Sequence, residues 1–200
     1  MSDVAEIWPP QRLPPSDVLL KDGTVGVVRR VSSVDRDEVA LLHEGLALDS
    51  IRMRFFTISR VAADVYVEHV LSSCECGSLL ALGLWHRSRL AGLATAEFID
   101  RESAEIAFVV TDHEHGLGIA TLLLEHLAAE ARRAGVRRFT AEVLVDNSPM
   151  LQVMSDAGFV VTRHSADGVV TIDMETGETR ASLAAADTRE AVSEAASVAL

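Results

Sequence analysis

The chain has 200 residues, 48% of them apolar and 24% charged, a composition typical of one soluble globular domain. Its formal net charge of −12 argues against nucleic acid or an anionic membrane as a partner, because both are bound through clustered Lys and Arg. Two cysteines one residue apart, Cys74 and Cys76, make neither a disulfide framework nor a zinc site, and no secretion signal or membrane-spanning stretch is evident, so we expect a cytoplasmic protein.

The first part of the chain predicts an extended segment, one strand and two helices. Four of the five prolines fall in the first fifteen residues, so we expect residues 1–20 to form a Pro-rich N-terminal segment. Residues 24–31 are strand-like, and Ser33 can cap a helix that runs through residues 37–48. A second helix is predicted over residues 59–71. Its valines are expected mostly on one side: Val61, Val65, Val67 and Val70.

Three strands are predicted in succession in the middle of the chain. They are residues 78–86, 90–99 and 104–110. Short polar turns at His86–Arg89 and Asp100–Ser103 connect them, which favours an antiparallel meander. Helical spacing of apolar residues then predicts a helix over residues 118–134, and Gly135 ends it.

The last part of the chain predicts a strand, a short helix and a hairpin. The strand covers residues 137–146, and the helix over residues 148–158 has Pro149 in its first turn, where proline is tolerated. Residues 159–174 predict a hairpin that turns near Ala166–Gly168. Residues 177–200 are an Ala-rich tail or linker, for which an exposed helix is the alternative. Helices among mostly antiparallel strands indicate a mixed α/β domain.

The stretch DHEHGLGIA, residues 112–120, joins a predicted strand to a predicted helix through two glycines. A nucleotide-hydrolase P-loop is excluded, because Ile119 and Ala120 stand where that motif requires Lys and Ser/Thr. A dinucleotide fingerprint fits poorly, because Thr121 takes the place of the third glycine. A plain turn is the remaining structural alternative. Glycines before a helix N-terminus nevertheless suit an anion, since N–H groups there lack intrahelical partners.

The stretch AEIAFVVTDHEHGLGIATLLLEHL resembles motif A of the GNAT acetyltransferase superfamily, a strand, a Gln/Arg-x-x-Gly-x-Gly/Ala loop and a helix. The resemblance continues through VRRFTAEVLVDNSPMLQVMSDAGFV. It implies a GNAT domain over residues 21–176, with helices on both faces of a mostly antiparallel sheet and two splayed strands that hold coenzyme A. It also implies an acetyl-CoA-dependent N-acetyltransferase, with acetyl-CoA as co-substrate and no metal.

The resemblance assigns the cofactor-binding residues. The glycine loop is expected to hold the pyrophosphate, and the strand before it is expected to lie along the pantetheine arm. The residues are Val109, Val110, Thr111, His113, His115, Gly116, Leu117, Gly118, Ile119, Ala120 and Asn147, where Asn147 is equally suited to capping a helix. Because His113 and His115 replace the usual Gln or Arg, we expect CoA affinity to strengthen as the pH falls toward 6. A metal site at this H-x-H is a minor alternative.

The chemistry of acetyl transfer to an amine requires a base. Glu105 is the leading candidate, because the resemblance places a general base at the glutamate of A-E-I, and its alternation with Ala107 and Val109 predicts apolar surroundings. Glu97 and Glu142 are the alternatives. Met154 stands where many relatives have the Tyr that protonates the leaving thiolate, so no standard general acid is present.

The segment DSIRMRFF resembles S-x-x-x-R-F-F of bacterial Pat-type domains, which acetylate protein lysines, for example of acyl-CoA synthetases. The resemblance extends to Pat-like domains fused to synthetase-like modules. It implies a protein partner with an exposed lysine, such as an acyl-CoA synthetase, and it is compatible with a longer multidomain protein. Two alternatives stay open: a small-molecule amine N-acetyltransferase and a non-catalytic CoA-sensing domain.

Overall fold

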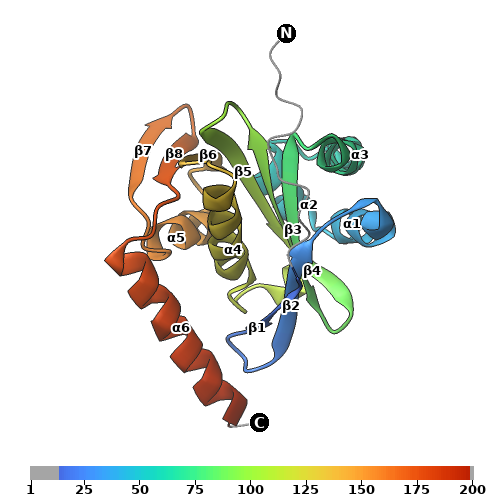
Figure 1. Cartoon of the computed structure of the whole chain (residues 1–200). Helices are drawn as coiled ribbons and strands as arrows, with labels where there is room; N and C mark the ends of the chain where they lie inside the picture. The colour runs from blue at the N-terminus through green and yellow to red at the C-terminus, as the bar shows by residue number, and fades with distance from the viewer. Residues whose placement is uncertain (1–13, 199–200) are drawn as a thin grey trace.

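A computed structural model of the protein describes residues 14–198 and contains one eight-stranded sheet in the order β1-β2-β3-β4-β5-β6-β8-β7 (Figure 1). Neighbouring strands are antiparallel except for β5 and β6, which are parallel. The mixed α/β class with a mostly antiparallel sheet is therefore confirmed. The strands are β1 (Ser16–Leu19), β2 (Val25–Arg30), β3 (Leu79–His86), β4 (Arg89–Phe98), β5 (Ser103–Val110), β6 (Arg138–Leu144), β7 (Val161–Ala166) and β8 (Val169–Glu175).

Helices cover both faces of the sheet, as predicted (Figure 1). They are α1 (Arg36–Glu44), α2 (Leu48–Phe55), α3 (Arg60–Cys76), α4 (Ile119–Arg133), α5 (Ser148–Asp156) and α6 (Arg180–Val198), with short 3-10 helices at Ser33–Asp35 and Asp112–Glu114. Two apolar cores result. One packs α4 and α5 against one face, around Phe139 and Leu123, and the other packs α1 to α3 against the opposite face, around Ile51 and Val70.

Sequence periodicity predicts one helix through residues 37–48, and the structure contradicts its last four residues, 45–48. The first helix, α1, ends at Glu44 with Gly45 as its C-cap, and Leu46 then turns inward with only 1% of its surface exposed. A new helix, α2, begins at Leu48. The break follows from Gly45, a poor residue in a helix interior, combined with the burial of Leu46.

The valines of α3 do not share one side, contrary to the prediction. Val67 and Val70 are 5% and 0% exposed, whereas Val61 and Val65 are 67% and 64% exposed. A helix rotates about 100° per residue, so residues 61 and 65 lie close together on one side and residues 67 and 70 on the opposite side. The buried side packs on β3, and the exposed side faces away from the sheet.

Two tight hairpin turns confirm the predicted meander and the predicted hairpin near the end of the domain. The β3–β4 turn places Arg87 and Ser88 at positive φ, 50° and 64°. The β7–β8 turn does the same at Asp167 and Gly168, with φ of 51° and 81°. Two consecutive left-handed residues make a turn whose twist matches that of antiparallel strands.

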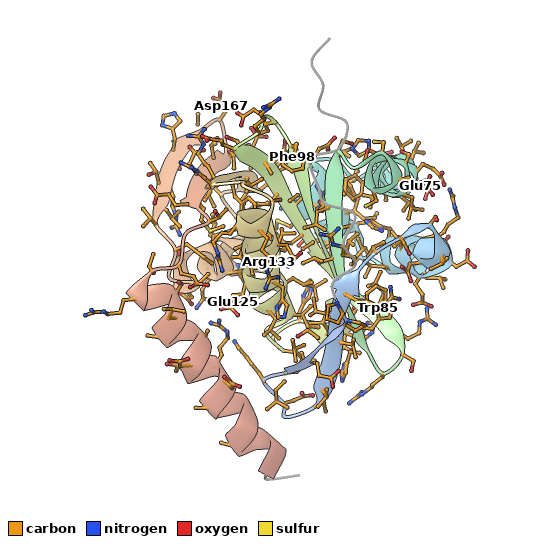
Figure 2. All side chains as sticks on the ribbon, viewed as in Figure 1. Glu75, Trp85, Phe98, Glu125, Arg133 and Asp167 are labelled. Atoms are coloured by element: carbon orange, nitrogen blue, oxygen red, sulfur yellow. The ribbon has the colours of Figure 1, made fainter. Side chains whose placement is uncertain are left out.

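The Ala-rich stretch near the end of the chain forms the helix α6. It runs from the end of β8 past α4 toward β1 (Figure 1). Arg189 of α6 pairs with Glu125, which Figure 2 shows on the part of α4 nearest α6, and Arg132 of α4 pairs with Glu178 at 2.6 Å. No helix within residues 14–198 is long and apolar enough to cross a membrane.

Candidate functional site

The parallel strands β5 and β6 separate after a short paired region. Their register covers only Ser103–Glu105 against Arg138–Thr140, although β5 remains paired with β4 up to Val110 and β6 remains paired with β8 up to Leu144. A cleft of about 60 Å³ opens beside Glu105, where the two strands diverge. Its lining includes Met53, Arg54, Phe56, Glu105, Ala107, Phe108, Glu142, Asn147, Met150 and Met154. The predicted splayed pair of strands is therefore present.

The two glycines of the loop after β5 both adopt left-handed backbone conformations. Gly116 has φ 85° and Gly118 has φ 83°, a region that side chains with a Cβ rarely adopt. A Cβ at Gly116 would have nothing within 4 Å, so this part of the loop is open. The first hydrogen bond of α4 runs from the Leu122 N–H to the Gly118 carbonyl. The preceding N–H groups, at residues 119–121, therefore precede the helical hydrogen bonds and can bind an anion.

The loop is supported from the β1–β2 turn by residues that sequence reasoning did not single out. The Lys21 N–H donates to the Leu117 carbonyl at 3.1 Å, and the Lys21 side chain lies 3.4 Å from where a Cβ of Gly118 would be. On the buried side of the loop, Glu114 is only 9% exposed and shares a hydrogen bond with His86 at the end of β3. No local pattern in the sequence connects these segments, so only the packing of the sheet reveals them.

Backbone orientation distinguishes the residues of β5 that were assigned to the pantetheine arm. The Thr111 N–H donates to the Ala91 carbonyl at 2.9 Å, which points it toward β4. Because strand backbone groups alternate in direction, the groups of Val109 also point toward β4, and those of Phe108 and Val110 face the gap. The Glu102 carbonyl accepts from the Arg138 N–H and therefore points toward β6. Phe108 and Val110 lie an even number of residues from Glu102, so their backbone groups point to the same side.

The two loop histidines, His113 and His115, are both exposed. The His115 Nε2 lies 3.1 Å from the Val110 carbonyl and 4.0 Å from a carboxylate oxygen of Asp112. His115 is therefore held at the end of β5, beside the loop glycines. Within residues 14–198, no group of three or more His, Cys, Asp or Glu is arranged to hold a metal ion.

Glu105 occupies the last position at which β5 and β6 pair, and its side chain is exposed in the wall of the cleft. The apolar neighbours that alternation predicts share this face with a second carboxylate. Glu97 lies directly opposite Glu105 across β4 and β5, and the Glu97 carboxylate is 3.0 Å from the His69 Nε2 on α3. Alternation along β5 does place Ala107 and Val109 on the same face, but the neighbouring strand contributes a carboxylate there. Glu142, the third candidate, lines the cleft from β6.

The helix α2 bridges the two walls of the cleft. At its start, the Asp112 carboxylate accepts hydrogen bonds from the Ala47 N–H at 2.8 Å and from the Ser50 hydroxyl. Farther along α2, Arg52 pairs with Asp146 at 2.6 Å, just after β6. Burial raises the pKa of Asp112, but the Ser50 and Ala47 hydrogen bonds outweigh it, so the pKa lies below its ordinary value. The residues that follow Arg52 are thereby held over the cleft.

Asn147 and Met154 both line the cleft from the α5 side. The Asn147 Oδ1 accepts the Met150 N–H at 3.2 Å, so this side chain caps α5. Met154 is 1% exposed and has no proton to donate. The only tyrosine, Tyr66 on α3, has its hydroxyl 2.8 Å from the Thr95 hydroxyl, on the strand next to the cleft wall.

The sequence matches a family model described as the acetyltransferase (GNAT) family over residues 47–159. It is 37% identical over 83 residues to the acetyltransferase Pat of Mycolicibacterium smegmatis, an alignment that covers 40% of this chain and 25% of that protein. The chain therefore spans about a quarter of the length of that curated relative.

Solved structures resemble the fold over most of the chain. The GNAT domain of S. lividans PAT superposes with a TM-score of 0.74 and 30% identity, covering 80% of this chain and 96% of that one. The acetyltransferase yncA of Salmonella typhimurium, solved with acetyl-CoA, superposes with a TM-score of 0.61 at 18% identity, covering 78% and 96%. RimJ of Mycobacterium smegmatis, solved with CoA-disulfide, gives a TM-score of 0.62 at 17% identity, covering 90% and 96%.

Proposed function

Because this chain belongs to the GNAT acetyltransferase family, as a Pat-like N-acetyltransferase, we propose that it acetylates lysine side chains of a protein substrate. Acetyl-CoA is the donor and Glu105 the general base. The observation that carries the proposal is the position of Glu105. It lies where β5 and β6 diverge, beside Met53 and Arg54 of α2 and Phe56 directly after it. The segment DSIRMRFF, which resembles that of Pat-type domains, forms α2 over this cleft and supports a protein substrate.

The glycine loop and the splayed strands suit the donor. The loop offers left-handed glycines and the first N–H groups of α4, which fit a pyrophosphate. The backbone groups of Phe108 and Val110 face the gap and can pair with an extended pantetheine arm as an added strand does. When bound, the thioester supplies an activated acetyl group.

The role of Glu105 is to remove a proton from the incoming amine. Lysine has an ordinary pKa near ~10.4, so it arrives as an ammonium ion at neutral pH. The Glu105 carboxylate is exposed in the cleft wall and can accept this proton directly or through one water. The N–H groups of Phe108 and Val110 can stabilise negative charge that develops on the carbonyl oxygen.

The leaving thiolate receives its proton without a tyrosine in this scheme. By the family resemblance, Met154 stands where many relatives have that tyrosine, and a thioether cannot donate a proton. Water, or the ammonium formed by attack of the amine, supplies the proton instead. Thiols have an ordinary pKa of about 8.5, so the thiolate is a tolerable leaving group.

The test is acetyl transfer followed by mass spectrometry. The acceptor panel holds a bacterial AMP-forming acetyl-CoA synthetase, an unrelated lysine-rich protein and several small amines. Labelling of one site on the synthetase supports the proposal and names the class of partner. Labelling of small amines alone would contradict it and establish a small-molecule N-acetyltransferase.

The base is tested separately with Glu105→Gln. We expect turnover to fall on the order of 100- to 10,000-fold while acetyl-CoA binding changes little. Glu142→Gln is the matched control, because Glu142 lines the same cleft from β6, and Glu97→Gln tests the carboxylate opposite Glu105. Loss of acetyl-CoA binding in Glu105→Gln, or an equal loss of turnover in Glu142→Gln, would contradict the role of Glu105.

A further inference from the structure

A buried histidine lies directly behind the glycine loop. His86 ends β3, one residue after Trp85, which Figure 2 labels beside β2, and it is 3% exposed. Its Nδ1 is 2.9 Å from the Glu114 carboxylate, and its Nε2 is 3.0 Å from the Thr24 hydroxyl. The ring therefore connects the loop after β5 with the β1–β2 turn.

The partners determine where the protons of the His86 ring lie. The Thr24 hydroxyl donates its only proton to the Asp22 carboxylate at 2.6 Å, so the Thr24 oxygen accepts from the His86 Nε2–H. The hydrogen bond between Nδ1 and the Glu114 carboxyl group then requires one proton between these two atoms. The hydrogen bond from Thr24 comes first among the causes that lower the pKa of Asp22, and attraction to His86 adds to it. His86 and Glu114 thus form a proton-sharing pair without net negative charge, and Thr24 and Asp22 lie on the other side of the ring.

The charge of this pair matters because of the location of Glu114. Glu114 lies two residues before Gly116, within the loop that is proposed to receive a pyrophosphate. A buried carboxylate there would repel the anion if nothing compensated it. The pairing with His86 removes that repulsion. The same β1–β2 turn also holds the other end of the loop, through the Lys21 N–H and the Leu117 carbonyl at 3.1 Å.

We propose that His86 is a positioning residue for cofactor binding, which compensates the Glu114 carboxylate and fixes the glycine loop to the β1–β2 turn. The inference rests on the proposed role of this loop in holding the pyrophosphate of the donor. It predicts an effect that is confined to donors that carry a pyrophosphate. S-acetylpantetheine, which has the thioester and pantetheine arm alone, is therefore the diagnostic probe.

The experiment compares His86→Leu with the wild type, using acetyl-CoA and S-acetylpantetheine as alternative donors. We expect kcat/KM for acetyl-CoA to fall about tenfold, through a rise in KM more than a fall in kcat. An effect of this size is typical when one member of a hydrogen-bonded network is removed. With S-acetylpantetheine we expect no change. His126→Leu is the matched control, because His126 is partly buried and bonds only to the Leu122 carbonyl of its own helix among the contacts of the described residues.

A second variant tests the charge argument directly. Glu114→Gln removes the carboxylate, so the double variant His86→Leu/Glu114→Gln should recover most of the acetyl-CoA affinity, and Glu114→Gln alone should not weaken it. If His86→Leu folds poorly, the double variant can still be measured, because it contains no uncompensated buried charge.

The outcomes separate this inference from the proposed function. An equal loss with both donors in His86→Leu, or a failure of Glu114→Gln to restore affinity, would contradict the role of His86. If the wild type itself used acetyl-CoA no better than S-acetylpantetheine, the loop would not hold a pyrophosphate, and this inference would fall, whereas lysine acetylation would still be decided by the acceptor panel.

Discussion

Asp112 accepts a hydrogen bond from the hydroxyl of Ser50, so the loop after β5 is attached directly to the first turn of α2. The same carboxylate accepts the Ala47 N–H at 2.8 Å, which caps that helix. The proposed cofactor loop and the proposed substrate helix therefore share one side chain. A substitution in the loop should therefore affect α2, and a substitution in α2 should affect the loop.

Asp112→Ala should lower stability and weaken both substrates. Loss of a helix cap costs about 1 kcal/mol of unfolding free energy, and α2 loses its attachment to the loop. We expect KM to rise for acetyl-CoA and for the amine acceptor together. Urea unfolding and two-substrate kinetics measure these effects, and Asp167→Ala in the β7–β8 turn is the control. An acetyl-CoA KM that rises alone would show that α2 does not depend on Asp112.

The lowered pKa of Asp112 also predicts how stability depends on pH. Its contribution is fully present above the ordinary value of 3.8 and is lost as the pH falls through the lower folded-state pKa. Asp112→Asn should therefore show a shallower loss of unfolding free energy than the wild type between about pH 4 and pH 2. Parallel curves for the two proteins would contradict this contribution.

Gly116→Ala and Gly168→Ala form a matched pair. Both glycines have positive φ, 85° and 81°, and both would give a new Cβ open space. Each substitution should cost about 1–2 kcal/mol of stability through backbone strain. Only Gly116→Ala should weaken CoA binding, because the new methyl group lies where an anion would approach. Calorimetric titration with CoA decides this, and an equal affinity in both variants would remove Gly116 from the site.

The histidines of the loop predict that CoA affinity depends on pH. His113 and His115 are exposed, and His115 is held at the Val110 carbonyl. Histidine side chains can become positively charged in mildly acidic solution, so we expect CoA binding to strengthen as the pH falls from 8 to 6. The double variant His113→Gln/His115→Gln should flatten this trend. A flat affinity in the wild type over the same range would contradict the prediction.

Buried His43 predicts a separate dependence of stability on pH. It is 1% exposed, and burial lowers its pKa below the ordinary value of 6.5. The folded state favours the neutral ring, so stability is complete above pH 6.5 and decreases as the pH falls below it, when the unfolded chain gains the proton. His43→Phe should reduce the difference in melting temperature between pH 7.5 and 5.5. His164→Phe, at the exposed β7–β8 hairpin, should leave that difference unchanged.

The sequence predicted those features that short stretches of chain encode. The turn at Asp167–Gly168 follows from residues that tolerate left-handed backbone, the turn at Arg87–Ser88 follows from a short polar break, and the strands follow from the apolar runs on either side. The glycine loop before α4 was likewise recognisable. Two glycines between an apolar strand and an apolar helix let the backbone N–H groups at the helix N-terminus approach an anion, and this can be seen in a short stretch of sequence. The wrong predictions, for the end of the helix over residues 37–48 and for the valines of α3, concern segments whose burial depends on distant neighbours.

The sequence alone thus determined the class of fold and identified the glycine loop and Glu105 as candidates for the site. Only the tertiary structure brought Glu97 opposite Glu105, Asp112 to α2, and His86 to Glu114 and Thr24, 28 and 62 residues away along the chain. The physical reason is that periodicity and turn chemistry act over a few residues, whereas these contacts arise when the sheet sets its strand order and register. A charge or hydrogen bond that depends on register has no local signature in the sequence.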